Sequence, residues 1–364
     1  MSSSNSEKEK EKEKEKEKIK KEKRRIVVMT GGSGGIGLNA VQRIVASKKV
    51  RVVVGVRKDR GTMPKQVERL TLDLSSLKSV YKFSVSVKEA LDGQPIDILV
   101  LNAGTTSQKL TDLSADGFLI TFGVNHLAHY YLVRLLLPNM ARGGRIVITT
   151  SDTHDPKVLS MAGGPTSLDL DLLKGMAYGK SKDIKAMKVY SFSKACNLLM
   201  ARYLADKDQF CIGQDLQVVA YNPGLTLGTG LGGTRPTSTK LSFKQKVASG
   251  LLKGASVFNK AMYPNDVPTA GKALARLILG KAKPPKKKIY ASMVKGKLTF
   301  PSPSLLVQDD EAVIFLWDES ENLLGKKFVK KLPTIILKKT SEIESNEKEN
   351  EKINSDSSTQ SEKN

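Results

Sequence analysis

Tyr190 and Lys194 are a pair of residues whose types and spacing could do chemistry. They lie four positions apart where the segment SFSKACNLLMARYLA begins, and its pattern predicts a helix. Side chains four positions apart share one helical face, so both could point into one cleft. A phenol loses its proton near about pH 10, and a nearby ammonium favours the phenolate. The pair could therefore exchange a proton with a substrate, although this spacing alone is too common to establish a site.

A glycine-rich turn lies near the start of the chain, in IVVMTGGSGGIGLNAVQR, residues 26–43. A short apolar run precedes the turn and a helical pattern follows it, which predicts strand, loop and helix. A pyrophosphate reaches the backbone N–H groups at a helix N-terminus only where no Cβ obstructs it. The turn fits TGxxxGxG through Gly31, Gly35 and Gly37, and it fits TGxxGxxG through Gly31, Gly34 and Gly37. Both spellings predict a dinucleotide site.

The end of the second predicted strand bears on the choice of cofactor. Val50–Val56 is apolar almost throughout and is followed by Arg57 and Lys58, with Asp59 one position further on. An acidic residue at this point suits a ribose 2′-OH, and a basic residue suits a 2′-phosphate. Arg57 and Lys58 therefore favour NADP(H), and the alternative is that they are solvated charges at a strand end.

The elements that must position these residues alternate between strand and helix over about 200 residues. Helices are expected from Ser75-Ser76 to about Leu91 and over roughly 115–140. Apolar runs without alternation predict a sheet that is buried on both faces, so we expect a doubly wound parallel sheet of the Rossmann type in three layers. The predicted strands are 26–28, 50–56, 67–74, 96–101, 144–151 and 216–221.

Polar residues gather where these strands end. Ligands bind at the carboxyl ends of strands in such sheets, and packing gives no reason for polar residues at one end only. The residues in question are Gly31 to Gly37, Arg57, Asp73, Asn102, Ser151 and Asn222.

The formal net charge of +23 is unevenly distributed. Residues 1–25 and 340–364 are Lys/Glu-rich or polar tails whose charges cancel, and they should remain solvated. The predicted single folded domain is therefore 26–339. Residues 235–297 carry fifteen Lys and Arg against one Asp. This excess could attract an anionic substrate, rest on an anionic membrane, or only keep the protein soluble.

Several classes of function lack support in the sequence. Two cysteines form no disulfide framework, no secretory signal or long apolar run is recognisable, and the histidines lack metal-ligand spacing. We expect an intracellular, cytoplasmic protein without a metal, with peripheral membrane contact left open. No zinc or aromatic-rich motif supports nucleic-acid binding. Packing or a surface position is the default interpretation of His126, His129 and His154.

Taken together, these residues resemble the short-chain dehydrogenase/reductase family. Seven elements occur in the family's order, and the NAG element indicates the classical branch and thus the TGxxxGxG spelling. The elements are TGGSGGIG, Asp73-Leu74, Asn102-Ala103-Gly104, Asn125, Ser151, YSFSK and Asn222-Pro223-Gly224.

The resemblance implies roles for individual residues. Tyr190 would be the general acid or base, Lys194 would hold the nicotinamide ribose and lower the pKa of the phenol, and Ser151 would bind the substrate oxygen. Asn125 would support a water-linked proton relay to Lys194. The implied cofactor contacts are Gly31, Ser33, Gly35, Ile36 and Gly37 at the pyrophosphate, Asp73 and Leu74 at the adenine, Asn102, Ala103 and Gly104 along the cofactor, and Pro223, Gly224 and Thr226 at the nicotinamide.

Further segments narrow the resemblance to the protochlorophyllide-reductase-like and retinol-dehydrogenase-like branch: SDTHDP, SKACNLL, PGLTLGTGL and LWDESENLLG. Two departures stand out. Ser151 and Tyr190 are 39 residues apart, much further than in the classical pattern. Residues 152–185 are therefore expected to form a substrate-side cover, and the resemblance implies the same for 225–300, where the family reads its substrate. Leu225 follows the Pro-Gly pair where the light-dependent reductase has a cysteine, which argues against light-driven chlorophyll chemistry.

The predicted activity is NADP-dependent hydride transfer to a carbonyl, or from an alcohol, on a largely apolar small molecule. Two alternatives from other classes stay open: a catalytically silent NADP-binding scaffold, and a basic protein that binds membranes peripherally. The sequence leaves the oligomeric state open.

Overall fold

The computed structural model describes residues 24–59, 61–180, 184–231, 243–257 and 259–334, without the side chains of 243–248. The predicted tails lie outside these residues, apart from Arg24 and Arg25. The chain divides into two units after Leu332, and every described helix and strand belongs to the first.

Within the described residues, one sheet of eight strands runs through the molecule in the order β3-β2-β1-β4-β5-β6-β7-β8. All neighbours pair in parallel except β7 and β8, which form an antiparallel edge. The predicted doubly wound parallel sheet is thus confirmed. The strands are β1 (Arg25–Thr30), β2 (Val50–Val56), β3 (Glu68–Thr71), β4 (Ile96–Leu101), β5 (Met140–Thr149), β6 (Gln217–Asn222), β7 (Tyr290–Val294) and β8 (Lys297–Thr299).

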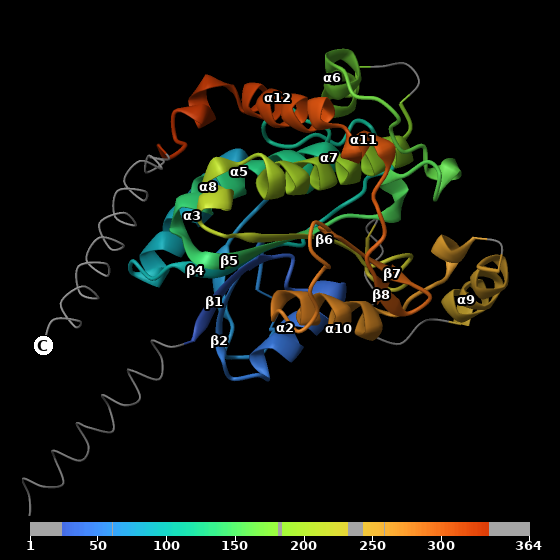
Figure 1. Ribbon diagram of the computed structural model, residues 1–364, viewed down its shortest axis with the longest axis horizontal. Coiled ribbons are helices and arrows are strands. Elements are labelled where there is room, and N and C mark those ends of the chain that lie inside the picture. The colour runs from blue at the N-terminus through green and yellow to red at the C-terminus, as the bar shows by residue number, and fades with distance from the viewer. Residues whose placement is uncertain (1–23, 60, 181–183, 232–242, 258, 335–364) are drawn as a thin grey trace, which may run out of the picture. The chain divides into compact units, whose positions relative to one another are not determined.

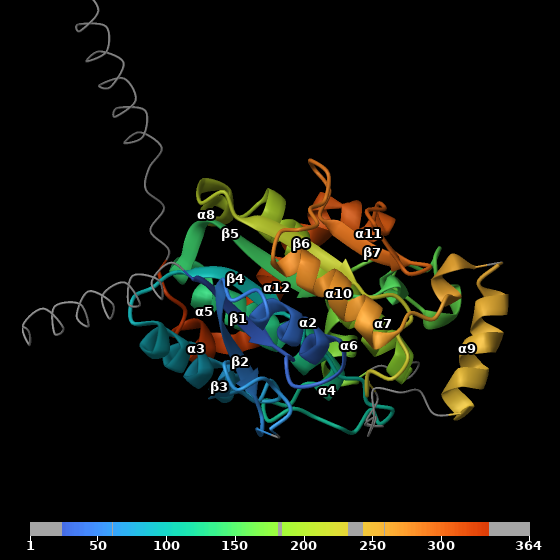
Figure 2. The ribbon, with the colours of Figure 1, turned by 90° about the horizontal axis from the view of Figure 1, so that it is seen from below.

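Helices cover both faces of the sheet, as its continuous apolar strands require. One face carries α3 (Leu77–Leu91), α5 (Ala128–Leu136) and α7 (Ala186–Asp206), with α12 (Asp310–Val329) packed outside α7 (Figure 1). The other face carries α2 (Gly35–Val45) and α10 (Val267–Ile278), which lie side by side in the view from below (Figure 2). Trp317 fastens α12 by stacking on Tyr203, with ring centroids 4.0 Å apart.

The long helix predicted over 115–140 begins later and is not uniform. It consists of α4 (Ile120–Phe122), a π-helical turn (Gly123–Leu127), α5 and a 3₁₀ turn (Leu137–Asn139). Residues 113–119 form a turn instead, because Gly117 adopts a φ of +84° and Leu113 bridges to Leu119. Met140 already belongs to β5, four residues before the predicted start of that strand.

The prediction that 225–300 is a substrate-side cover needs correction. This interval contains α10, which packs against α2, and β7 and β8, which extend the sheet. The basic residues that dominate its composition are compatible with this core position because Lys272 and Arg276 lie on the exposed face of α10. The helix α9 (Phe243–Ala255) and α6 (Leu170–Tyr178), within 152–185, lie outside the sheet layers.

Two short α-helices are α8 (Gln209–Gly213) after α7 and α11 (Leu305–Gln308) before α12, and 3₁₀ turns lie at Asp152–His154, Ser160–Ala162 and Lys260–Met262. The helix with Tyr190 and Lys194 begins at Ala186, so both residues lie inside α7 and not at its start.

Candidate active site

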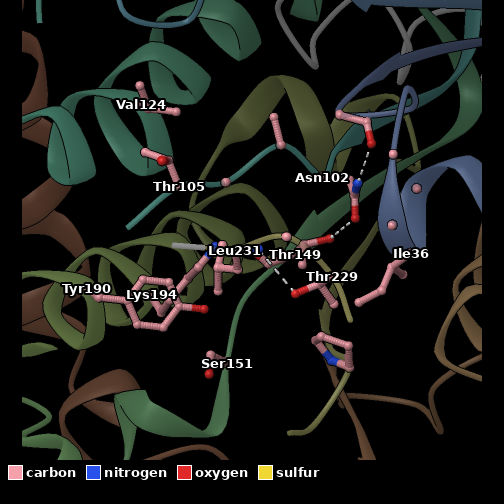
Figure 3. A pocket seen from close by; sticks show the side chains of 18 of the residues that line it. Ile36, Asn102, Thr105, Val124, Thr149, Ser151, Tyr190, Lys194, Thr229 and Leu231 are labelled. Carbon is pink, nitrogen blue, oxygen red and sulfur yellow. Dashed lines mark hydrogen bonds between the residues drawn. The ribbon is translucent and has the colours of Figure 1, made fainter. Parts of the chain in front are cut away.

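A cavity of about 700 Å³ lies at the carboxyl ends of β1, β2, β4, β5 and β6 (Figure 3). Most of the predicted site residues line it, whereas Lys58 and Asn125 do not. The predicted residues that line it are Gly31, Ser33, Gly35, Ile36, Gly37, Arg57, Asp73, Leu74, Asn102, Ala103, Gly104, Ser151, Tyr190, Lys194, Pro223, Gly224 and Thr226.

The glycine turn packs closely against neighbouring backbone at the glycines of the TGxxxGxG motif, and not at Gly34, which only the TGxxGxxG motif requires. A Cβ on Gly31, where φ is +69°, would lie 2.6 Å from Ala103, and a Cβ on Gly37 would lie 1.9 Å from the Gly31 carbonyl oxygen. Gly35 also has a positive φ, of +51°. A Cβ on Gly34 would meet nothing within 4 Å. The structure therefore requires glycine at the TGxxxGxG positions, and the resulting bare backbone before α2 suits a pyrophosphate.

Asn102 joins three strand ends behind this turn. Its Nδ2 donates to the Gly31 carbonyl at 3.0 Å, and its Oδ1 accepts from the Thr149 hydroxyl at 3.0 Å. The Thr30 hydroxyl accepts the backbone N–H groups of Asn102 and Ala103 at 3.0 and 3.1 Å. Asn102 thus shapes the site through the backbone of the glycine turn as well as lining the cavity.

At the end of β2, Arg57 is exposed and lines the cavity. Asp59, the nearby acidic residue, pairs with Arg69, whose Nε lies 3.1 Å from its carboxylate. A cationic side chain therefore faces the cavity at this strand end while the carboxylate has a partner elsewhere. After β3, the Asp73 carboxylate accepts the backbone N–H of Ser75 at 2.9 Å. The neighbouring Leu74 is buried and also lines the cavity.

Tyr190 and Lys194 stand one turn apart on α7 and face the other end of the cavity, near Ser151 (Figure 3). Lys194 is buried and its Nζ donates to the Thr149 carbonyl at 3.3 Å. The same Nζ lies 5.6 Å from the centre of the Tyr190 ring. A phenol, an amine and a hydroxyl that are distant in the chain thus share one cavity with the glycine turn.

Burial dominates the acid–base properties of this pair. Removal from water lowers the pKa of Lys194 to about 8 and raises the pKa of Tyr190 to about 12, which the hydrogen bond with Ser151 partly offsets. The expectation that Lys194 lowers the pKa of the phenol stays a prediction for the cofactor-bound protein, and in this structure the pKa of Tyr190 is raised. Desolvation of the phenolate is the largest influence on Tyr190 here.

Asn125 lies in the π-helical turn behind the cavity and is fully buried. Its Oδ1 accepts the Thr105 N–H at 2.7 Å, and its Nδ2 donates to the Thr105 carbonyl at 2.9 Å and to the Ser193 hydroxyl at 3.0 Å. Ser193 in turn donates to the Tyr190 carbonyl at 2.7 Å. Asn125 therefore connects the loop after β4 to the helix that carries Tyr190.

Some residues of the site escaped the sequence analysis. Thr30 and Thr149 hold the strand ends together, and their position directly beside Gly31 and Thr150-Ser151 could have indicated this. Leu159, Met187 and Leu231 line the substrate side of the cavity. Leu159 and Leu231 come from segments without a clear periodic pattern, whereas Met187 lies on the first turn of α7, three residues before Tyr190.

Within the part of the chain that the structure describes, no group of three or more His, Cys, Asp or Glu side chains could hold a metal ion. Cys196 and Cys211 are both free and buried. No described helix combines the length and the apolar character that crossing a membrane demands.

Comparison with known proteins gives consistent matches. Residues 25–162 match the family model described as short chain dehydrogenase. A short-chain dehydrogenase/reductase of Pestalotiopsis microspora is 30% identical over 67% of this chain and 84% of its own length. Protochlorophyllide reductase A of Oryza sativa subsp. japonica is 29% identical over 82% of this chain and 80% of its own.

Among solved structures, an uncharacterized protein from Mycobacterium paratuberculosis superposes with a TM-score of 0.59 and 25% identity. The match covers 85% of this chain and 95% of that one.

Proposed function

The chain belongs to the short-chain dehydrogenase/reductase family, in its protochlorophyllide-reductase-like branch, and we propose that it uses NADP(H) to interconvert a carbonyl and an alcohol on a largely apolar small molecule. The observation that carries this proposal is the convergence of Tyr190, Lys194 and Ser151 on the cavity that the glycine turn borders. The nicotinamide supplies hydride chemistry when it is bound.

The chain's own residues handle the proton and the developing charge. In the reductive direction the Tyr190 hydroxyl gives its proton to the substrate oxygen as the carbonyl carbon receives hydride, and the alcohol forms. The Ser151 hydroxyl donates a hydrogen bond to the same oxygen while it gains negative charge. Lys194 stays oriented by the Thr149 carbonyl, so its ammonium adds positive charge beside the phenol once a ligand excludes water.

A preference for NADP(H) is supported by charge at the end of β2. Arg57 faces the cavity and can bind a 2′-phosphate, while Asp59 is engaged by Arg69 and does not compete for a ribose hydroxyl. Lys58 is exposed but does not line the cavity, so Arg57 is the better candidate of the two.

An apolar substrate is supported by the lining on the Tyr190 side. Leu159, Met187, Leu225 and Leu231 border the cavity there. Leu225 directly follows the Pro223-Gly224 pair and offers neither a proton nor a nucleophile. The substrate class proposed is therefore a hydrophobic aldehyde, ketone or alcohol reduced or oxidised in the dark.

The test combines cofactor titration with a panel of hydrophobic aldehydes and ketones. NADPH should bind at least about tenfold more tightly than NADH, and Arg57→Ser should remove most of that difference. Equal affinities in the wild type would contradict the NADP preference. Tight NADPH binding without turnover of any carbonyl or alcohol would favour a catalytically silent scaffold.

A further inference from the structure

The chain contains three histidines, and all three are buried. His129 and His154 each contact the main-chain carbonyl of a residue in the site, Asn125 and Ser151 respectively. His126 contacts Ser320 on α12 instead. The partners of each ring determine which nitrogen carries the proton, and this separates the first two histidines from the third.

His154 lies between the Ser151 carbonyl and the start of α11. Its Nε2 lies 3.2 Å from the backbone N–H of Ser304, which can only donate, so Nε2 is the acceptor. The proton of the neutral ring is then on Nδ1, which donates to the Ser151 carbonyl at 2.8 Å. One imidazole thus fastens the backbone of Ser151 to a segment about 150 residues further along the chain.

His129 makes the corresponding contact on the other side of the cavity. The Thr30 hydroxyl already accepts two backbone N–H groups, so its own proton is donated to His129 Nε2 at 2.9 Å. Nδ1 therefore carries the ring proton and donates to the Asn125 carbonyl at 3.0 Å. The ring connects the end of β1, before the glycine turn, to the π-helical turn.

His126 has the opposite arrangement. The Ser320 hydroxyl donates to the Leu316 carbonyl at 2.6 Å, so it accepts a hydrogen bond from His126 Nε2 at 2.8 Å. His126 Nδ1 has no hydrogen-bond partner within 3.5 Å among the residues that the structure describes, although the Asn197 side chain lies near enough to raise the pKa of the ring slightly. This ring supports the packing of α12 and forms no direct hydrogen bond with Asn125, Ser151, Tyr190 or Lys194, so it serves as the comparison for the other two histidines.

Burial keeps all three rings neutral at pH 7. Desolvation lowers the pKa of His126 to about 3 and that of His129 to about 4, and it lowers the pKa of His154 as well. Neutral rings can donate through one nitrogen and accept through the other, as these contacts require.

We propose that His129 and His154 are positioning residues of the reaction, in which each Nδ1–H holds the backbone of a site residue at its working distance from Tyr190. The inference rests on the proposed function. Both anchored residues lie where the regular backbone pattern changes, because Asn125 lies in a π-helical turn between two α-helical segments and Ser151 in the junction between β5 and a three-residue 3₁₀ turn. A displacement of about 1 Å at such a position can cost about 100-fold in rate.

The first experiment reads the tautomers directly by long-range ¹H–¹⁵N NMR of the full chain at pH 7. Only three histidine spin systems exist, and single variants assign them. We expect the Nδ1–H form for His129 and His154 and the Nε2–H form for His126. An Nε2–H form or a charged ring at His129 or His154 would overturn the inference, whether or not the protein turns over a carbonyl.

The second experiment compares substitutions at His154. Asparagine places an amide donor near the position of Nδ1, whereas glutamine places its amide near the position of Nε2. H154Q should lower kcat about 10- to 100-fold with the Kd for NADPH unchanged, and H154N should retain most of kcat. At His129, H129Q should likewise lower kcat more than H129N does.

The control is H126N, which should lower the melting temperature without changing kcat per folded molecule. Melting temperatures are measured for all variants. Wild-type kcat in H154Q, or losses that follow melting temperature equally at all three histidines, would refute the positioning role. A wild-type protein that binds NADPH but reduces no carbonyl would refute the proposed function instead, and the NMR result would still decide the inference.

Discussion

The two ends of the cavity are built in different ways. At the nucleotide end, which the glycine turn borders, backbone packs so closely on backbone that a Cβ on Gly31 or Gly37 would lie within 3 Å of a neighbouring peptide. At the substrate end, beside Tyr190, the lining includes apolar side chains of α7 and of loops, and two of them, Met187 and Leu231, remain 46% and 42% exposed. The comparison indicates that the strand ends and the glycine turn determine the shape of the nucleotide end, whereas side chains of α7 and the loops determine the shape of the substrate end.

The largest effect should come from Tyr190, which faces the substrate end of the cavity. Tyr190→Phe removes the proton donor and should lower kcat about 10²- to 10⁴-fold, with the Kd for NADPH unchanged. Steady-state kinetics on the best carbonyl of the panel and a cofactor titration measure both. Wild-type turnover in this variant would mean that the substrate end carries the chemistry without Tyr190.

The backbone contacts of the nucleotide end are tested by a matched glycine pair. Gly37→Ala puts a methyl group 1.9 Å from the Gly31 oxygen, so the turn must move. We expect loss of NADPH binding and a destabilisation of about 1–3 kcal/mol or more. Gly34→Ala meets open space and should cost less than about 1 kcal/mol with cofactor binding retained. Calorimetry and urea unfolding distinguish the two, and similar losses in both variants would erase the contrast.

The buried charge of Lys194 should lower the free energy of unfolding of the wild-type protein at pH 7. Its pKa is lowered to about 8 by burial, so the folded protein holds a charge that the surroundings disfavour. Lys194→Met should therefore abolish turnover yet raise the free energy of unfolding at pH 7 by about 2 kcal/mol, after the loss of the bond to Thr149 is counted.

The sign of the pH dependence follows from the same shift. Between about pH 8 and the unfolded value near 10.5, the native state binds fewer protons than the unfolded state, so the wild type regains stability as pH rises. The advantage of Lys194→Met should be complete below about pH 8 and should shrink toward pH 10.5. Urea unfolding at pH 7 and pH 10 measures it, and an advantage that grows with pH would contradict the assigned direction.

The smallest effects are expected at the substrate end. Met187→Ala and Leu231→Ala remove half-exposed side chains and should change the free energy of unfolding by less than about 0.5 kcal/mol. Their KM values for hydrophobic carbonyls should rise about threefold to tenfold, more for larger substrates, without a change in NADPH affinity. An effect on NADPH binding comparable to that of Gly37→Ala would show that the two ends are not built independently.

Much of the scaffold could be predicted because its signals are local. Val50–Val56 was predicted with the bounds that β2 has, and the end of β4 likewise. The start of the long helix was wrong because a turn at Gly117 interrupts a stretch that still reads as helical. The core role of α10 and β7 was missed because lysines on exposed faces dominated the composition of 225–300.

The residues that line the site could be predicted better than their pKa values and tautomers. Tyr190, Lys194 and Ser151 were identified from type, spacing and order, and they line one cavity. The rise of the Tyr190 pKa in this structure could not be predicted, because desolvation depends on how segments far apart in the chain surround the ring. The tautomers of His129 and His154 were likewise beyond reach, since each depends on a partner about 100 to 150 residues away.

By itself, the amino-acid sequence determined the alternation of strands and helices and the polar groups at the strand ends. These depend on the periodicity of neighbouring residues, which is written along the chain. Only the tertiary structure decided which glycines are indispensable, which ring nitrogens carry protons and which side chains border the substrate. Each of those depends on contacts across space, where a few tenths of an ångström or one donated proton changes the outcome.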